Sequence, residues 1–337
     1  MLPKITIITP SYNQGHFLEQ TIDSVLSQNY PDLEYMVIDG GSTDNSIEII
    51  KKYEKHLTYW VSEKDNGQSD AINKGLRKTT GEVVNWLNSD DYYEKDTLNI
   101  IGNSFRNQKI NVVCGRSRIF YDEGNQTSHF SSGTDIYKHN LAKTIGWARI
   151  DQPETFFRVS AIHQMGLLNK KFHYVMDKEW WIRYLLLFGL DNILQIEDIL
   201  VNFRLHGNSK TVSQQKGFQI ETNSLFYELA TIKSLTDKKA FLSNLSEIKE
   251  KINQDFYSKI DKSLIERVIN YYLLYKADEY YYFGNTQTAK KCLKTIDENL
   301  LEIVDRKLFK ELNQKVNIPA FLIKILRFLK SKMPQNT

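Results

Sequence analysis

The sequence has few of the features that mark secreted, membrane-spanning or nucleic-acid-binding proteins. It contains only two cysteines, Cys114 and Cys292, which lie far apart, so we expect neither a disulfide framework nor a cysteine metal cluster. No run of about 18 apolar residues is present, and the first residues lack a basic segment followed by an apolar one, which predicts a cytoplasmic protein without a secretion signal. Lys and Arg total 44 against 41 Asp and Glu, and this balance predicts no nucleic-acid partner.

The first 110 residues alternate short β-branched runs with amphipathic stretches. One such stretch places Leu18, Ile22, Val25 and Leu26 on a single helical face. Repeated strand–helix–strand units at this spacing predict parallel strands joined by right-handed crossovers. The fold class is therefore α/β, with a Rossmann-like, mostly parallel sheet flanked by helices. The predicted strands cover residues 5–9, 35–38, 57–61 and 82–87.

The pattern changes twice further along the chain. Short strands are expected between 112 and 130, then a helix at 177–188 and a last strand at 199–204. Beyond about residue 212 only helical signals remain, which predicts an α/β domain over 1–210 and a helical C-terminal region over 211–337. Within that region, residues 277–293 show the spacing of one tetratricopeptide-like hairpin. No second copy is seen, so ordinary helical packing is favoured over a repeat array.

The last segment, residues 318–333, contains no acidic residue and places large apolar residues among four basic ones, the apolar ones including Phe321, Leu322, Ile325, Leu326, Phe328 and Leu329. A helix of this composition is a candidate for peripheral contact with the anionic inner face of a membrane. The alternative is a helix that packs on the protein's own body and keeps its lysines in water.

Polar residues follow each of the four predicted strands. The carboxyl ends of parallel strands meet at one edge of a sheet, where ligands bind. We therefore expect these residues to share one site. They are Thr9 and Tyr12 after the first strand, Asp39 after the second, Asp65 after the third, and Asn88, Ser89, Asp90 and Asp91 after the fourth.

Three of these groups have a specific chemical interpretation. Asp90 and Asp91 offer paired carboxylates of the kind that hold Mg²⁺ or Mn²⁺ against substrate phosphates, or they cap the next helix. Asp39 could accept a hydrogen bond from the N3–H of a pyrimidine base, or bond the amides of its own turn. The ring of Tyr12 could stack on a base.

Two further residues belong to the later strands and helices. Asp177 begins a helix rich in aromatic residues, and an apolar neighbourhood raises a carboxyl pKa toward that of a general base. Capping of the helix is the alternative for this residue, and Glu179 should point to a different face. His206 ends the last predicted strand and could bind a metal or a phosphate, although a structural hydrogen bond is the commoner role of a lone histidine.

These segments together resemble the family 2 glycosyltransferases of the GT-A fold, over about residues 3–210. The matching pieces are TPSYNQGHFLEQTIDSVLSQNYPDLEYMVIDGGSTD, SEKDNGQSDAINKG, LNSDD, QPETFFR, MDKEWW and FRLHGNS, in that order. The resemblance implies an inverting transfer of a sugar from a nucleotide sugar to an acceptor hydroxyl, in assembly of a bacterial-type surface polysaccharide or glycan. It divides the domain into a nucleotide-binding half, 1–110, and an acceptor half, 111–210.

The resemblance also implies roles for single residues. Pro10, Tyr12 and Asp39 match the nucleoside-binding set, with a UDP- or dTDP-sugar as the expected donor, and Asp65 matches a further nucleotide contact. Asp177 matches the catalytic base. The acceptor would be a glycan or a lipid-linked glycan, and residues 152–158 would shape its side of the site.

The metal set carries one departure from the family pattern. Asp90 matches the metal-binding aspartate of the Asp-x-Asp motif, Asp91 stands beside it, and His206 matches the histidine that completes the metal or diphosphate site. Asn88 replaces the first aspartate of the motif, which removes one negative charge. Mn²⁺ or Mg²⁺ is the cofactor that this set implies.

Two other classes of protein compete with the transferase as interpretations of these motifs. A sugar-1-phosphate nucleotidyltransferase would need an early glycine-rich loop with basic residues, and residues 9–16 contain one glycine and no Lys or Arg. A non-catalytic nucleotide-sugar or glycan-binding module stays open as the second alternative. A dehydrogenase is excluded because no Gly-x-Gly-x-x-Gly follows the first strand.

Overall fold

The computed structural model describes residues 1–147, 149–207, 209–249 and 252–318. These residues form two compact units. Unit 1 comprises residues 1–144, 148–225 and 248–252, and unit 2 comprises 145–147, 226–247 and the chain from Asn253 onward. The division into domains at residue 210 stays a prediction. From residue 319 onward, the predicted membrane-contact segment lies outside the residues that the structure describes.

Unit 1 is built on one mixed sheet with the strand order β3-β2-β1-β4-β8-β6-β9-β5, and β7 pairs with β6. The parallel pairs are β1/β2, β1/β4, β2/β3 and β6/β9, and the remaining pairs are antiparallel. The α/β class and the parallel pairing of the first strands are confirmed. The strands are β1 Ile5–Ser11, β2 Leu33–Asp39, β3 Tyr59–Ser62, β4 Val83–Trp86, β5 Tyr92–Tyr93, β6 Val112–Tyr121, β7 Gln126–Phe130, β8 Thr155–Arg158 and β9 Ile193–Leu205.

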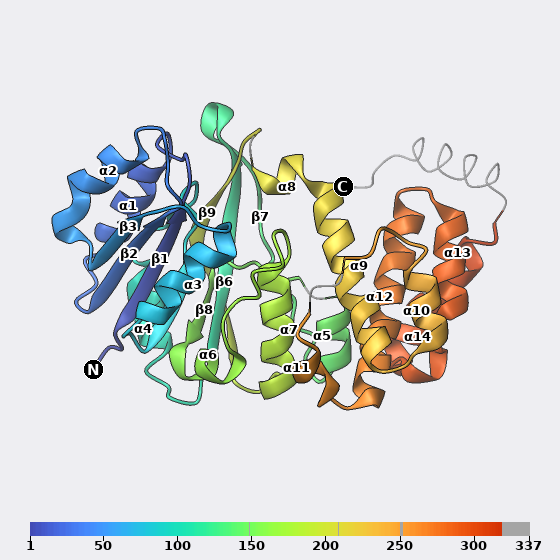
Figure 1. Ribbon diagram of the computed structural model, residues 1–337. Coiled ribbons are helices and arrows are strands. Elements are labelled where there is room, and N and C mark those ends of the chain that lie inside the picture. The colour runs from blue at the N-terminus through green and yellow to red at the C-terminus, as the bar shows by residue number, and fades with distance from the viewer. Residues whose placement is uncertain (148, 208, 250–251, 319–337) are drawn as a thin grey trace, which may run out of the picture. The chain divides into compact units, whose positions relative to one another are not determined.

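Helices flank this sheet, as the blue to green ribbons of Figure 1 show. Helix α3 packs on β1 and β2, while α1 lies against β5 and α2, and α6 lies against β8 and α7. The predicted apolar face of α1 is buried through Leu18, Ile22 and Val25 in the core of the unit. The helices of this unit are α1 Leu18–Leu26, α2 Ser46–Tyr53, α3 Gln68–Lys78, α4 Thr97–Ser104, α6 Val159–Met165, α7 Met176–Phe188 and α8 Lys210–Ser213.

Strand β8 was missed in the sequence. It lies between β4 and β6 and is antiparallel to both, and all four of its residues are buried. Arg158 ends the strand and donates to the backbone carbonyls of Ile110 and Phe105 at 2.8 and 2.9 Å. Residues 155–158 are therefore part of the sheet, and only the segment before them is available to a site.

Unit 2 is helical, as predicted. The long helix α12 (Lys262–Tyr282) and α13 (Thr286–Thr295) form a hairpin, and Gly284 between them has a φ of 82° that favours glycine. Asp261 and Asn285 cap the two helices by accepting from Leu264 N and Thr288 N. The other helices are α10 Thr236–Leu242, α11 Gln254–Ser258 and α14 Ile303–Lys315, while α5 (Leu141–Trp147) and α9 (Gln215–Ile232) contribute residues to both units.

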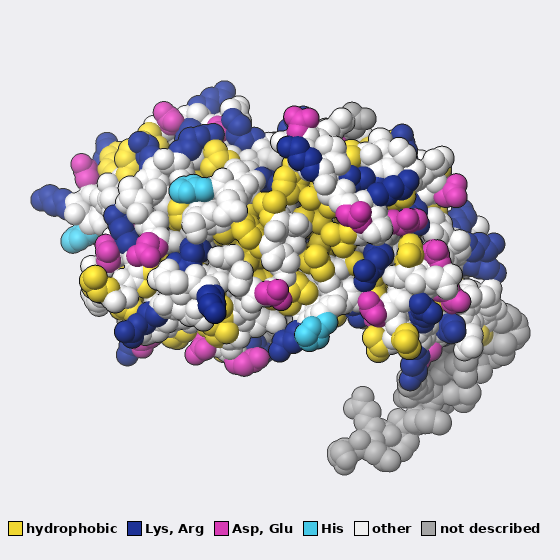
Figure 2. All heavy atoms as spheres, turned by 90° about the horizontal axis from the view of Figure 1, so that it is seen from below, with side chains coloured by type: hydrophobic (Ala, Val, Ile, Leu, Met, Phe, Trp, Pro, Cys, Tyr) yellow, Lys and Arg dark blue, Asp and Glu magenta, His cyan; other side chains and the backbone are white. Residues whose placement is uncertain are grey.

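The face of the molecule shown in Figure 2 carries both signs of charge. Basic and acidic side chains are interspersed over the face shown in Figure 2, in keeping with the near-neutral composition. No helix among the described residues has the length and apolarity needed to cross a bilayer.

Candidate active site

A cavity of about 970 Å³ opens at the carboxyl ends of the parallel strands in unit 1. The register aligns these ends, because Ser11 pairs with Asp39 and Asp39 pairs with Ser62. Eight of the predicted site residues line the cavity, and Thr9, Asp39 and His206 do not. The eight are Pro10, Tyr12, Asp65, Asn88, Ser89, Asp90, Asp91 and Asp177.

The loops after β1 and β2 are tied to each other. Asn13 donates its backbone N–H to Ser42 Oγ at 2.8 Å, and its side-chain oxygen accepts from Thr43 N at 2.8 Å. This bonding leaves Tyr12 at the cavity wall with 61% of its surface exposed. An exposed ring next to an anchored residue is suited to stack on a planar base.

Asp39 lies beneath the cavity wall, fully buried. Its carboxylate accepts from Gly41 N at 3.0 Å, Ser42 N at 2.8 Å and Ser62 Oγ at 2.6 Å. Bonding of its own turn is thus the role that the structure describes, and direct contact with a base stays a prediction. Gly41 has a φ of 83°, which only glycine adopts without strain. Because Asp39 accepts hydrogen bonds from the N–H groups of this turn, it shapes the glycine loop that lines the cavity.

Thr9 is also buried, and its hydroxyl lies 3.1 Å from Tyr35 Oη inside the sheet. Its contact with a nucleotide stays a prediction, and the structure places its side chain inside the sheet. Asp65 is placed at the wall, where its Oδ1 accepts from Gly67 N at 2.8 Å. A Cβ on Gly40 would lie 2.8 Å from Asp65 Oδ2, so glycine is needed at 40 for this approach.

Asp90 and His206 come together from β4 and β9. Asp90 Oδ2 lies 3.1 Å from His206 Nε2, and the histidine ring packs on Phe17 with centroids 4.8 Å apart. In an octahedral site, two neighbouring ligand atoms that are each about 2.1 Å from the cation lie roughly 3 Å from each other. The separation between Asp90 and His206 therefore fits binding of one octahedral ion. Among the described residues no group of three acidic, His or Cys side chains surrounds such a point. Phosphate and water oxygens would therefore complete the coordination.

Asp91 is held differently from Asp90. It is 1% exposed, and its oxygens accept from Arg204 N at 2.9 Å and from Asn88 Nδ2 at 3.2 Å. Burial and the charge of Asp90 raise the pKa of its carboxyl well above the usual range. Neither aspartate caps a helix, because β5 follows them and α4 has Asp96 as its N-cap. Metal binding by Asp91 stays a prediction, and its present bonds fix the loop that carries Asp90.

A chain of side-chain hydrogen bonds crosses the cavity wall to this loop. Lys210 Nζ donates to Gln68 Oε1 at 2.9 Å, and Gln68 Nε2 donates to Asn88 Oδ1 at 2.8 Å. Asn88 in turn donates to Asp91. Burial lowers the pKa of Lys210. Neither Lys210 nor Gln68 was predicted, since their place in the cavity depends on loops distant in sequence.

Asp177 lines the cavity from the first turn of α7. Burial raises the pKa of its carboxyl, which is the direction that its aromatic neighbourhood predicts. Its Oδ1 accepts from Lys178 N at 2.7 Å, while the N-cap position belongs to Val175, so the capping alternative is wrong. Glu179 faces away and pairs with Arg183 at 2.9 Å, as expected.

Glu221 holds the loop in front of Asp177, a role that no local sequence pattern indicates. Its carboxylate, on α9, is 2% exposed and accepts from the backbone N–H groups of His173, Tyr174 and Val175 at 2.8 to 3.2 Å. Charge-assisted hydrogen bonds of this type are strong and directional. The position of Asp177 at the cavity therefore depends on a residue 44 positions further along the chain.

Glu221→Ala is expected to lower the free energy of unfolding by about 1–3 kcal/mol, because buried N–H groups lose their acceptor. Urea denaturation of both proteins measures the change. Glu123→Ala, at an exposed glutamate, serves as the control and should stay within about 0.5 kcal/mol of the parent protein. Equal stability of the Glu221 variant and the control would contradict the role given to Glu221.

The sheet has a carboxylate-lined cleft at the carboxyl ends of its strands, where the strand order reverses. This arrangement is typical of α/β proteins of the nucleotide-binding class. The family model for glycosyl transferase family 2 matches residues 6–172. The chain belongs to this family, and the predicted glycosyltransferase class is confirmed.

Known proteins agree with this assignment. An uncharacterized glycosyltransferase of Rickettsia typhi is 26% identical over 222 residues, which are 62% of this chain and 66% of that protein. The putative teichuronic acid biosynthesis glycosyltransferase TuaG of Bacillus subtilis is 40% identical over 101 residues, 28% of this chain and 39% of that protein. The chain thus spans no more than about two thirds of the length of these curated relatives.

Solved structures support the GT-A fold. The structure of S. aureus TarS 1–349 in complex with UDP-GlcNAc matches with a TM-score of 0.57 and 15% identity, over 88% of this chain and 82% of that one. At this identity the likeness concerns the fold alone. The predicted α/β class of the GT-A type is confirmed.

Proposed function

We propose that the chain is an inverting glycosyltransferase that moves a sugar from a nucleotide-diphosphate sugar, with UDP- and dTDP-sugars as first candidates, to the hydroxyl of a glycan or lipid-linked glycan. One observation carries the proposal: Asp90, after β4, and Asp177, on α7, line the same cavity as the Gly40–Gly41 loop. The family and the similarity to TuaG support a place in polysaccharide assembly.

Each group has a defined part in the proposed reaction. The acceptor oxygen forms a bond to the anomeric carbon while the bond from that carbon to the phosphate oxygen breaks, so the configuration inverts. Asp177 takes the proton of the acceptor hydroxyl, as its raised pKa allows. A divalent ion, Mn²⁺ or Mg²⁺, held by Asp90 and His206 would supply positive charge to the departing diphosphate.

A thermal-shift panel of nucleotide sugars, with and without Mn²⁺, tests the donor part of this proposal. We expect one sugar nucleotide to raise the melting temperature more with Mn²⁺ than without it, because a ligand that binds only the folded state stabilises it by linkage. The free sugar and the free nucleoside serve as controls. No shift with any UDP- or dTDP-sugar would reject the proposed donor class. Donor binding without transfer to any glycan would favour the non-catalytic module instead.

A further inference from the structure

Arg204 of β9 is a buried cation whose side-chain bonds have no part in the proposed reaction so far. It is 7% exposed, and its Nε donates to the backbone oxygen of Asp90 at 2.8 Å. Its two terminal nitrogens donate to Asp122, after β6, and to Gln20 of α1. A guanidinium presents its donors in a rigid planar fork, so three acceptors from three segments fix both its position and its plane. Arg204 is therefore held in one orientation beside the loop that carries Asp90.

Aromatic rings lie around the same guanidinium. Its Cζ is 4.7 Å from the centroid of the Phe17 ring, 5.0 Å from that of Phe120 and 5.7 Å from that of Tyr92. A cation within about 6 Å of a ring centroid is attracted to the ring. The Phe17 ring also packs against the imidazole of His206, at 4.8 Å between centroids. Phe17 thus links Arg204 to the histidine of the proposed metal pair.

The loop after β4 is held through its backbone. The carbonyls of Ser89 and Asp91 accept from Thr21 Oγ1 at 3.0 and 2.7 Å, and the carbonyl of Asp90, which lies between them in the chain, accepts from Arg204. The backbone N–H of Arg204 donates to Asp91 Oδ1 at 2.9 Å. Side chain and backbone of one residue therefore hold two neighbouring aspartates of this loop against β9.

These contacts act on the distance between the two proposed ligand atoms. Asp90 Oδ2 and His206 Nε2, 3.1 Å apart, belong to segments that are distant in the chain. Arg204 bonds the backbone of Asp90 directly and reaches His206 through the ring of Phe17. Groups that orient metal ligands are worth roughly 10–100-fold in metal affinity. Arg204 has the contacts of such a group, and it acts on both ligands at once.

We propose that Arg204 is a positioning residue for the divalent ion, because its fixed guanidinium sets Asp90 and His206 at the spacing that one cation requires. The inference rests on the proposed function and adds a residue on which metal affinity depends. Arg204 does not contact the ion, since each of its three side-chain nitrogens already has an oxygen acceptor. The ion pair with Asp122 offsets its positive charge, which would otherwise oppose a cation nearby.

Arg204→Lys tests the inference, because lysine keeps the positive charge but loses the planar fork. Mn²⁺ binding in the presence of UDP is measured from the electron paramagnetic resonance signal of the free ion. We expect the variant to bind Mn²⁺ about tenfold or more weakly than the parent protein. UDP binding without a metal, measured by calorimetry, should be unchanged. This second readout distinguishes positioning of the metal ligands from damage to the cavity that Arg204 lines.

Phe17→Leu is a second variant for the case that Arg204→Lys does not fold. It keeps an apolar side chain at this position but removes the ring that contacts both Arg204 and His206. Weaker Mn²⁺ binding than in the parent protein is expected here also. The melting temperature of each variant without metal shows whether it folds.

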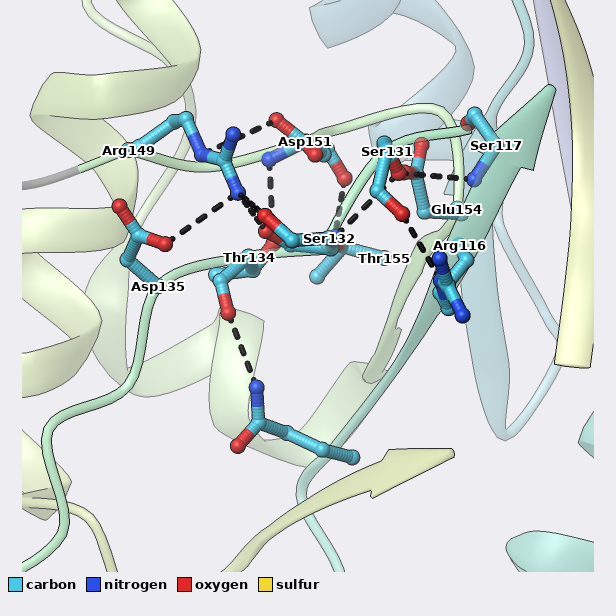
Figure 3. A network of polar contacts seen from close by, with 12 residues as sticks. Arg116, Ser117, Ser131, Ser132, Thr134, Asp135, Arg149, Asp151, Glu154 and Thr155 are labelled. Carbon is cyan, nitrogen blue, oxygen red and sulfur yellow. Dashed lines mark hydrogen bonds and ion pairs between the residues drawn. The ribbon is translucent and has the colours of Figure 1, made fainter. Parts of the chain in front are cut away.

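Two other arginines of unit 1 provide matched controls. The guanidinium of Arg118 lies 4.9 Å from the same Phe120 ring, but it donates to Asn202 Oδ1, at 3.1 Å, instead of to the loop after β4. Arg149 bonds Asp135 at 3.2 Å within the polar network that Figure 3 shows. Arg118→Lys and Arg149→Lys make the same exchange of side chains, and both should keep the Mn²⁺ affinity of the parent protein.

The possible failures have distinct meanings. Parent-level Mn²⁺ affinity in a folded Arg204→Lys would overturn the inference and leave the proposed function in place. An equal loss of affinity in Arg118→Lys, or an equal loss of UDP binding without metal, would overturn it as well. Where Arg204→Lys does not fold, parent-level affinity in Phe17→Leu has the same consequence. If the parent protein binds no Mn²⁺ in the presence of UDP, the metal part of the proposed function is rejected, and the inference with it.

Discussion

Asp177→Asn is expected to reduce sugar transfer by about 10²–10⁴-fold, because the amide cannot accept the proton of the acceptor hydroxyl. Binding of the nucleotide sugar should be unchanged, since the side chain keeps its size and Oδ1 keeps its bond to Lys178 N. Radiolabelled transfer and donor calorimetry on the same preparation measure the two effects.

Asp191→Asn provides the control for this substitution. It changes an exposed aspartate shortly after the end of α7 and should leave transfer at the level of the parent protein. Near-full turnover in the Asp177 variant would show that Asp177 is not the catalytic base. Loss of donor binding together with transfer would point to misplacement of the helix.

The pH profile offers an independent check on Asp177. Burial raises its pKa, so the base becomes deprotonated only at a higher pH than an exposed aspartate requires. We expect transfer to rise with pH over a range that lies above the ordinary titration of aspartate, and to level off once the carboxyl is ionised. A rate that stays flat from acidic to neutral pH would contradict proton transfer to this group.

Asp90→Ala is expected to abolish the part of donor binding that depends on Mn²⁺. The substitution removes the carboxylate that lies 3.1 Å from His206 and fits a shared cation. Calorimetric titration of the donor at several Mn²⁺ concentrations gives the measurement. If the metal dependence of the variant matches that of the parent protein, Asp90 does not hold the ion.

Asp91→Asn separates ligation from positioning in the same motif. Its carboxylate bonds Arg204 N and Asn88, and an asparagine can keep the first of these bonds. If Asp91 only fixes the loop, Mn²⁺-dependent donor binding should survive in this variant while it disappears in Asp90→Ala. Equal losses would make Asp91 a metal ligand, as the sequence predicted.

Local sequence patterns were sufficient for the first half of the sheet. Strands β1 to β4 are mainly apolar runs, and each lies within about two residues of its predicted range. Strands β5 and β8 were missed for a physical reason. Two residues in β5 give no usable periodicity, and β8 is a strand only because β4 and β6 supply its partners on both sides.

The site was predicted unevenly for a related reason. Polar residues at strand ends must lie at one edge of a parallel sheet, which is why Pro10, Asp65 and Asp90 were found together. Asp39 also lies at that edge, but only the packed structure reveals that its oxygens are taken by its own loop and by Ser62 of β3. Glu221 had no local signal, because its role depends on the backbone N–H groups of a loop distant in sequence.

The sequence by itself determined the α/β class, the family and the acidic residues that the chemistry needs, because strand periodicity and motif order are local properties of the chain. The tertiary structure decided which of those residues face the cavity: Asp90 beside His206, Asp177 on a loop held by Glu221, and Asp39 beneath the wall. Burial and hydrogen-bond partners arise only when distant segments pack together. Together they determine where each carboxylate side chain points and whether it is ionised.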